Sequence, residues 1–363
     1  MAVSRINEAG LNVNQYGNRN LIINGAMQVD QRGSYTITTT GSPEYGGPDR
    51  FHMWSYTSSE QVVGDVTQST DVPSGNGFGY SRKFDVTTAE SAVAADEALI
   101  MAQLIEAQNL QHLEYGTSSA KDVTMSFWIK STKTGTYCFF INQEDGTRIY
   151  VKEYTVDASD TWEKKIITIP GDASGTINND NGRGLWVGWV LMAGTNRHGT
   201  ANEWRATSTD YATSNQVNAV DSASNNIYLT GVQLEVGDTA TDFEHRTFSD
   251  DLTLCQRYFN RSYPYGVATA AANNNTPIHH MSRGGSYNII GQFFHPRDMR
   301  ASPTVVLYNP IDGTVNQLKG DGSSYANAAL LSNSPRGASF FVNGTTITAT
   351  IFLSVHATFD AEL

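Results

Sequence analysis

The chain has 363 residues, a length that favours two domains over one compact β-sandwich. Its formal net charge is −12, and Lys and Arg form no cluster, which excludes a phosphate backbone or an anionic membrane surface as a partner. Charged residues make up only 17%, whereas aromatic residues reach 10% and glycines number 32. This composition excludes disorder and favours short strands joined by tight turns.

Cysteine usage and apolar runs narrow the class of protein further. Cys138 and Cys255 are the only two cysteines and lie far apart, so we expect buried free thiols rather than a disulfide framework or a zinc site. The longest apolar run, 185–193, falls well short of the ~18–20 residues of a membrane span. Residues 1–13 lack the apolar stretch of an export signal, so we expect synthesis in a cytoplasm.

The first predicted elements follow a polar segment. Residues 1–20 alternate Asn with Gly and Tyr, and we expect an extended leader or anchor there. The run 21–24 predicts the first strand. The run 98–113 partly follows a helical spacing and predicts a short helix.

The clearest strands lie between residues 123 and 169. Apolar and polar side chains alternate over 123–130, which predicts a strand with one buried face. Further strands are predicted at 136–142, 148–156 and 162–169. An Asp-Gly pair at 145–146 predicts a hairpin turn, and regular short strands of this kind are typical of an antiparallel sandwich.

A second helix is predicted at 249–262, with Ser249 as its N-cap and Asp250 and Asp251 in its first turn. Beyond it the chain returns to Gly-, Asn- and Ser-rich strands, ending in the alternating run 346–359. The prediction is therefore an all-β protein: a leader at 1–20, an antiparallel jelly-roll β-sandwich at 21–248, a short linking helix at 249–262, and a smaller C-terminal β-sandwich at 263–363.

Several runs resemble known families. The run 20–26 (NLIINGA) resembles the first strand of jelly-roll carbohydrate-binding modules. Other runs resemble a family of bacteriophage tail-fibre and virion structural proteins; they are 48–51 (PDRF), 123–130 (VTMSFWIK), 160–171 (DTWEKKIITIPG), 228–237 (YLTGVQLEVG), 243–246 (FEHR), 254–259 (LCQRYF) and 361–363 (AEL). They occur in the expected order along nearly the whole chain.

This resemblance implies a virion location, a homotrimer and a C-terminal β-structured tip. It also implies attachment to other virion proteins, in the tail or the capsid, through the N-terminal segment. The expected external partner is host-surface polysaccharide. The resemblance supplies no catalytic residue, metal ligand or cofactor, and none is predicted; nucleic acid and membrane insertion are not expected.

Candidate binding residues gather in the long polar loop 194–216, where aromatic rings and planar polar groups suit the faces and hydroxyls of sugars. The candidates are Asn196, His198, Trp204, Arg205 and Tyr211, together with Trp128 on the polar side of its strand. The competing interpretation is that Trp204 packs this loop onto its own sandwich or onto a neighbouring subunit.

Other tryptophans favour packing roles or a second aromatic face. Trp186 and Trp189 must lie on opposite faces of one strand, and packing within the fold is the favoured role of both. A further hypothesis is that Trp54 and Tyr56 line the same face as Trp128.

Three functions remain open. The first is a phage fibre that binds host-surface glycans through the jelly roll and the tip. The second is a purely architectural capsid decoration or head fibre. The third is a glycan-cleaving enzyme, which the absence of a recognisable catalytic motif disfavours.

Overall fold

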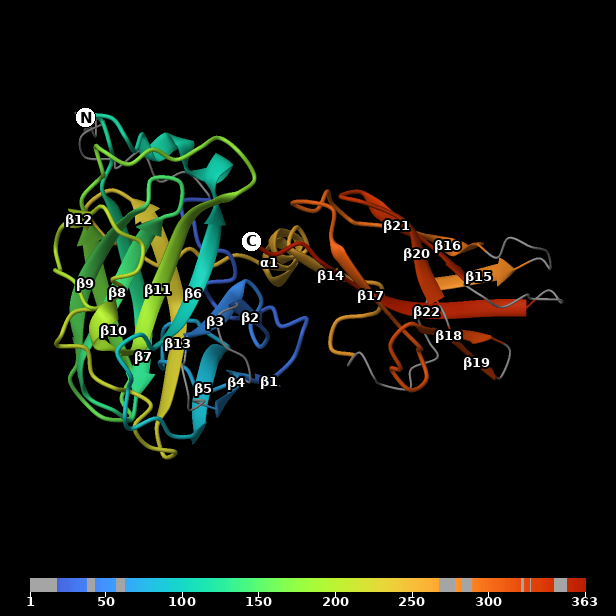
Figure 1. Cartoon of the computed structure of the whole chain (residues 1–363), viewed down its shortest axis with the longest axis horizontal. Helices are drawn as coiled ribbons and strands as arrows, with labels where there is room; N and C mark the ends of the chain where they lie inside the picture. Colours follow the sequence, from blue (N-terminus) through green and yellow to red (C-terminus); the bar gives the residue numbers. More distant parts are fainter. Residues whose placement is uncertain are drawn as a thin grey trace, which may run out of the picture.

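Two β-rich lobes make up the protein (Figure 1). The computed structural model describes residues 18–37, 43–56, 63–267, 278–282, 289–320, 323–326, 328–342 and 351–363. All pairings between strands in both lobes are antiparallel. The predicted fold class, an antiparallel jelly-roll sandwich with a short helix and a second β-structured part, is confirmed.

The first lobe packs two sheets face to face. One sheet has the order β1 (Tyr35–Thr36), β4 (Val63–Ser69), β5 (Ser81–Thr88), β13 (Asn226–Val236), β7 (Val123–Ser131) and β10 (Glu163–Ile169). The other, the seven-stranded sheet, has the order β12 (Trp204–Arg205), β9 (Arg148–Val156), β8 (Gly135–Gln143), β11 (Arg183–Ala193), β6 (Ala98–Glu106), β3 (Phe51–Tyr56) and β2 (Pro43–Tyr45). The four strands expected between residues 123 and 169 correspond to β7, β8, β9 and β10.

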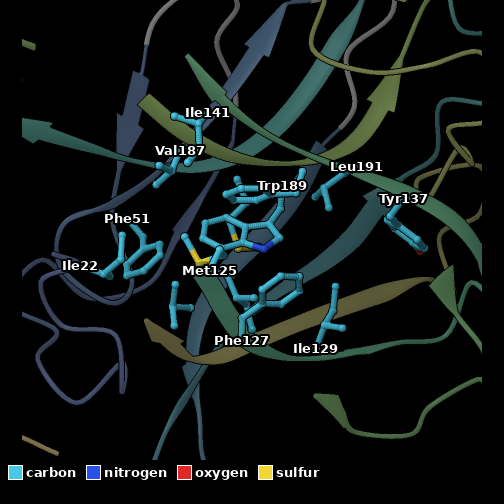
Figure 2. Close-up of a cluster of buried hydrophobic side chains, with 14 of the residues drawn as sticks. Ile22, Phe51, Met125, Phe127, Ile129, Tyr137, Ile141, Val187, Trp189 and Leu191 are labelled. Atoms are coloured by element: carbon cyan, nitrogen blue, oxygen red, sulfur yellow. The ribbon is translucent and has the colours of Figure 1, made fainter. Parts of the chain in front are cut away.

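Trp189 of β11 lies at the centre of the core between these sheets (Figure 2). Its ring centre lies 5.6 Å from that of Phe127 in β7 and 5.3 Å from that of Phe139 in β8. All three side chains are at most 1% exposed. Alternation along each strand thus sends one set of side chains inward, and burial of this set supplies most of the driving force for pairing the sheets.

The helix expected at 98–113 is wrong for most of its length. Residues Ala98–Glu106 form strand β6, and only Ala107–Leu113 form a helix, the 3₁₀-helix η1. All nine residues of β6 are buried, because β6 lies between β11 and β3 and is covered on both faces. A strand buried on both faces lacks apolar–polar alternation, so its sequence is easily confused with that of a buried helix.

The strand expected at 21–24 is also wrong, because this segment is a series of bends. Asn24 has a φ of 60°, in the left-handed region that strands do not adopt. Its side-chain amide donates hydrogen bonds to the carbonyls of Val29 (2.8 Å) and Asp49 (3.0 Å). Asn24 therefore fixes a turn rather than a strand.

Residues 18–22 lie against the segment 232–246, where the chain leaves the first lobe. The Glu244 carboxylate accepts hydrogen bonds from the backbone amides of Asn18 (2.6 Å) and Asn20 (2.9 Å). The Asn20 side chain donates to the Val232 carbonyl (3.0 Å), and Arg246 donates to the Asn20 carbonyl (2.7 Å). We call this set of contacts the entry–exit clamp. Residues 1–17 of the predicted leader lie outside the described residues, whereas Asn18 and Asn20 belong to the clamp.

Helix α1 (Phe248–Cys255) links the lobes but is shorter than the predicted 249–262. Its N-cap is Thr247 rather than Ser249, since the Thr247 hydroxyl accepts the Asp250 amide hydrogen (3.2 Å). The helix ends at Cys255 because Phe259–Arg261 pairs as strand β14 with the last strand of the chain. This long-range pairing replaces the helical hydrogen bonds that local spacing favoured.

The second lobe also contains two sheets. Its larger sheet is built around β22 (Ile351–Asp360), with β14, β15 (Ile278–Ser282), β17 (Thr304–Tyr308), β18 (Gln317–Gly320) and β19 (Ser323–Ala326). Its smaller sheet has the order β16 (Ile289–Phe294), β21 (Gly337–Val342) and β20 (Ala328–Ser334). Phe340 and Phe359 are fully buried between the sheets in a separate core.

Buried ion pairs join the two lobes. Arg50, which is 1% exposed, pairs with Glu362, and its guanidinium carbon lies 3.4 Å from the ring centre of Tyr258. Arg257, just after α1, pairs with Glu106 at the end of β6 (2.7 Å). Because these charges are withdrawn from solvent, each depends on its partner, and the contacts hold the lobes together.

Candidate functional site

A cleft of about 490 Å³ opens on the outer face of the seven-stranded sheet. Its wall is aromatic, with Trp54 from β3, Trp186 from β11 and Tyr211 from the loop 194–216. Asn142 from the end of β8 and Glu144 just beyond it contribute polar groups. A pocket of this size, with aromatic walls and a few polar groups, is typical of small-ligand sites.

The pleat of the sheet explains why these side chains face outward. On β3, Phe51 and Met53 point into the core, so His52, Trp54 and Tyr56 point away from it. On β11 the same alternation puts Trp189 inside and Trp186 outside, as expected from their spacing.

Gly188 leaves room for the Phe140 ring on the outer face of the seven-stranded sheet. A side-chain carbon at this position would lie 2.5 Å from the Phe140 ring, so only glycine lets that ring lie flat over β11. The Phe140 ring centre lies 5.0 Å from that of Trp186, at an interplanar angle of 88°. Phe140 thereby fixes the orientation of the tryptophan.

Tyr211 folds down from the loop onto the sheet. Its ring centre lies 5.3 Å from that of Trp186, 5.4 Å from Trp54 and 5.1 Å from Phe140. Next to Tyr211, Ala212 exchanges backbone hydrogen bonds with Gly199 (2.7 Å) and Arg197 (3.1 Å). These hydrogen bonds join two parts of the loop to each other and hold Tyr211 in place as one wall of the cleft.

Three buried polar atoms around the cleft have no hydrogen-bond partner among the described residues. They are Trp186 Nε1, His52 Nδ1 and Asn142 Oδ1. The three side chains are at most 7% exposed, and all three residues line the cleft. Buried polar groups are almost always satisfied by protein, water or ligand. An N–H donor and a carbonyl acceptor thus lie beside the aromatic rings, with a partner still to come from water or a ligand.

The buried part of the site carries no charge. Burial, and then the charges of Arg82, Arg50 and Arg183, lower the pKa of His52 well below its usual value, so the imidazole is neutral at pH 7. Burial raises the pKa of Tyr211 to about 12, so its hydroxyl stays protonated. Glu144 and Arg183 lie exposed at the rim. The inner surface suits an uncharged ligand with hydroxyl groups.

Of the residues predicted from sequence, Tyr211 is the one in this cleft. Trp204 and Arg205 form β12 at the sheet edge and alternate in direction. The Trp204 ring packs inward against Tyr150 (5.6 Å) and Tyr115 (5.9 Å), and its indole N–H donates to the Pro170 carbonyl (2.8 Å). The half-buried Trp204 therefore makes the contacts expected if it packs the loop onto its own sandwich. Sugar binding by Trp204 stays a prediction.

The remaining predicted residues have other partners. Arg205 pairs with Asp210 within the loop. The Asn196 side chain donates to Asp96 (2.9 Å), and the His198 ring lies 3.2 Å from the Ala193 carbonyl. These three groups shape the loop, and their contact with a ligand stays a prediction.

Trp128 belongs to the other sheet. It lies on the outer face of β7, and its ring packs over Gly231. Trp54 lies on the seven-stranded sheet, so the hypothesis that it shares a face with Trp128 is wrong. The alternation along a strand predicts which side chains point away from the core. It does not predict to which of the two packed sheets the strand belongs, because both sheets have the same pattern.

Sequence reasoning missed Trp54, His52 and Asn142 as neighbours of Tyr211. A usable signal was present: Trp54 and Tyr56 alternate with Phe51 and Met53, so two aromatic rings leave the core side of one strand. The pairing of β3 with β6 and of β6 with β11 brings Trp54 next to Trp186, with ring centres 5.0 Å apart. Such long-range pairing is not visible in a local pattern.

No group of three or more His, Cys, Asp or Glu side chains with the arrangement of a metal site occurs among the described residues. In the same part of the chain, no helix is long and apolar enough to span a membrane. Both cysteines are buried and free, as expected.

Comparisons with known proteins give limited similarity. No protein-family model and no curated protein matches the sequence. A putative sugar-binding protein from Bacteroides thetaiotaomicron is similar over 60% of this chain and 99% of its own, with 10% identity and a TM-score of 0.33. A family 11 carbohydrate-binding module from Clostridium thermocellum, solved with a mixed-linked β-1,3-1,4 tetrasaccharide, covers 58% of this chain and 99% of its own, with 16% identity and a TM-score of 0.27.

The enzymatically active domain of tailspike protein 4 from bacteriophage CBA120 is similar over 60% of this chain, with 12% identity and a TM-score of 0.32. The similar region spans only 21% of that tailspike chain.

Proposed function

We propose that this protein is a structural component of a bacteriophage particle, a fibre that binds a neutral glycan of the host surface in the aromatic cleft. One observation carries the binding part of the proposal: Trp186 Nε1, His52 Nδ1 and Asn142 Oδ1, which line the cleft with the Trp54 and Tyr211 rings, have no hydrogen-bond partner within the described part of the chain. Sugars present apolar C–H faces edged by hydroxyl groups, which such rings and polar atoms complement. The phage part rests on the ordered sequence resemblance.

Binding without cleavage is part of the proposal. Most glycosidases use two carboxyl groups, about 5–10 Å apart, on either side of the scissile bond. Glu144 is the one carboxylate among the described residues that line the cleft. Incubating the protein with the polysaccharide that it binds, and then measuring chain length, tests this point. Any progressive shortening would contradict it.

Self-association, for which we propose a homotrimer, is supported by the small sheet of the second lobe. Phe294 of β16 is 73% exposed, and Leu331 of β20 is 55% exposed. A partner chain that covered these two side chains would remove their apolar surface from water. Light scattering should give three chain masses for the wild type and a smaller mass for the Phe294→Ser, Leu331→Ser double variant. A wild-type monomer would remove this part of the proposal.

The glycan site is tested by alanine substitution in two sheets. Trp54 is half-buried at the cleft, and Trp128 is half-buried on the opposite sheet. On an array of host-surface glycans, Trp54→Ala should weaken binding about tenfold or more, as for a central aromatic contact. Trp128→Ala should bind like the wild type. The reverse result would move the site to the other sheet.

The particle location requires its own experiment. Antibody labelling of intact phage, viewed by electron microscopy, should mark a projecting fibre. The purified protein should also compete with phage for adsorption to cells, and Trp54→Ala should not. Labelling on the capsid shell, without competition, would support the architectural alternative.

A further inference from the structure

A hollow of about 780 Å³ lies at the junction of the two lobes. Its floor is the outer face of β14, β22 and β17. In the strand register, Thr358 of the central strand β22 lies opposite Arg261 of β14 and also opposite Val306 of β17. The side chains of these three residues therefore lie on the same face of the sheet. The loop 30–33 of the first lobe faces this floor. The hollow therefore exists only where the lobes meet.

Arg261 is the polar centre of this junction hollow. Its side chain is buried, at 9% exposure, and its Nη1 donates to the carbonyls of Gln31 (2.8 Å) and Val267 (3.0 Å). Its Nη2 has no partner among the described residues. A buried guanidinium nitrogen without an acceptor is costly, so a hydroxyl, carbonyl or water oxygen is required there.

Two tyrosine rings lie beside the Arg261 guanidinium. The Arg261 guanidinium carbon lies 5.0 Å from the ring centre of Tyr263 and 5.5 Å from that of Tyr265. The Tyr265 hydroxyl donates to the Gln28 carbonyl (3.3 Å) and accepts the Asp30 amide hydrogen (2.8 Å). Its ring also meets the Phe248 ring, with centres 5.0 Å apart, and Tyr265 remains 39% exposed. Part of this residue is therefore open to a ligand.

Charges in the hollow balance. Arg32 is occupied by Asp360 (2.9 Å) and Glu362 (3.2 Å). Among the described residues that line the hollow, the remaining charges are those of Arg261 and Asp30, one of each sign. Burial raises the pKa of Asp30 despite the hydrogen bond from Gly33 and the nearby arginines. A neutral ligand rich in hydroxyl groups fits better than an ion.

We infer that the junction hollow is a second saccharide site, which binds a neutral oligosaccharide segment. Tyr265 stacks against one sugar ring, Arg261 Nη2 donates to a hydroxyl, and the Asp30 carboxylate accepts from another. The volume lies within the ~300–1,000 Å³ of small-ligand pockets. The site shares no lining residue with the aromatic cleft, so it does not depend on the function proposed for that cleft.

The test uses the full chain carrying Trp54→Ala, which weakens binding at the aromatic cleft about tenfold or more. Saturation-transfer NMR and titration calorimetry would be run with neutral tetrasaccharides (glucans, galactans and mannans) and with uronic-acid tetrasaccharides. At least one neutral probe should bind. Adding Tyr265→Ala should weaken that binding about tenfold, whereas Tyr265→Phe, which keeps the ring, should stay within about twofold. Thermal unfolding verifies that each variant is folded.

Three results would overturn the inference: no neutral probe binds the Trp54→Ala chain, Tyr265→Ala leaves binding unchanged, or only uronic acids bind. The aromatic cleft is tested separately, by comparing glycan binding of the wild type with that of the Trp54→Ala variant. Failure of one site is therefore distinguishable from failure of the other.

Discussion

The Tyr211 ring meets the Trp186 ring edge to face, with centres 5.3 Å apart and an interplanar angle of 66°. One residue comes from a long loop and the other from the middle of a sheet. Their contact makes the loop and the sheet a single rigid surface. Binding at this surface should therefore require little rearrangement, and the following predictions treat the cleft as preformed.

Trp186→Phe should weaken glycan binding about fivefold, because the ring face is kept but the free indole N–H is lost. Stability should fall by only about 1 kcal/mol, since the described residues offer this N–H no partner within the fold. Calorimetric titration and urea unfolding measure the two quantities. Unchanged affinity would show that the N–H does not face the ligand.

Glycan affinity should be constant between about pH 5.5 and pH 8. Burial lowers the pKa of His52 well below its usual 6.5, and burial raises the pKa of Tyr211 to about 12, so neither group changes charge in this range. Titrations at several pH values provide the measurement. A step in affinity near pH 6.5 would mean that His52 is protonated in the site.

Trp204→Ala should lower stability by about 2 kcal/mol, because it removes packing against Tyr150 and the hydrogen bond to the Pro170 carbonyl. If Trp204 only packs the sandwich edge, glycan affinity of the folded variant should equal that of the wild type. Loss of affinity with unchanged stability would instead support the sequence-based assignment of Trp204 to the binding site.

Arg50→Met should lower the free energy of unfolding by about 3 kcal/mol, because it removes one of the two arginines that pair with the buried Glu362 side chain and leaves only Arg32 (3.2 Å) among the described residues. Arg336→Met is the matched control: Arg336 is 81% exposed in its pair with Asp298, and its loss should cost about 0–1 kcal/mol. Urea unfolding of both variants compares the two pairs. Equal effects would contradict the buried role of Arg50.

Glu106 should make stability depend on acid pH. Burial alone would raise the pKa of Glu106, but hydrogen bonds from Arg257 and Tyr258 outweigh burial and hold it below the usual 4.5. A lowered pKa in the folded state gives stability that is complete above pH 4.5 and is lost as the pH falls through the folded-state value.

The stability difference between wild type and Glu106→Gln should therefore be largest at pH 7 and shrink below pH 4.5. Chemical unfolding at a series of pH values supplies the comparison. A difference that does not vary with pH would show that the ionised carboxylate is not what binds Arg257.

Local patterns predicted the strands in which apolar and polar side chains alternate. Strand β7 alternates Met125 and Phe127 with polar residues, and the Asp-Gly pair at 145–146 marks the turn between the paired strands β8 and β9. The run Ala98–Glu106 misled because both of its faces are covered. The sequence predicted only part of the candidate site. Tyr211 was among the predicted residues, but its neighbours Trp54 and Asn142 were not, because their strands come together only through the order of the whole sheet.

The entry–exit clamp has a mechanical consequence. Residues 18–22 and 232–246 are held side by side by Glu244, Asn20 and Arg246. Tension applied between residue 18 and the linking helix therefore loads these few contacts and bypasses the strands of the first lobe. A protein pulled at these points would keep its aromatic cleft undistorted until the clamp gave way.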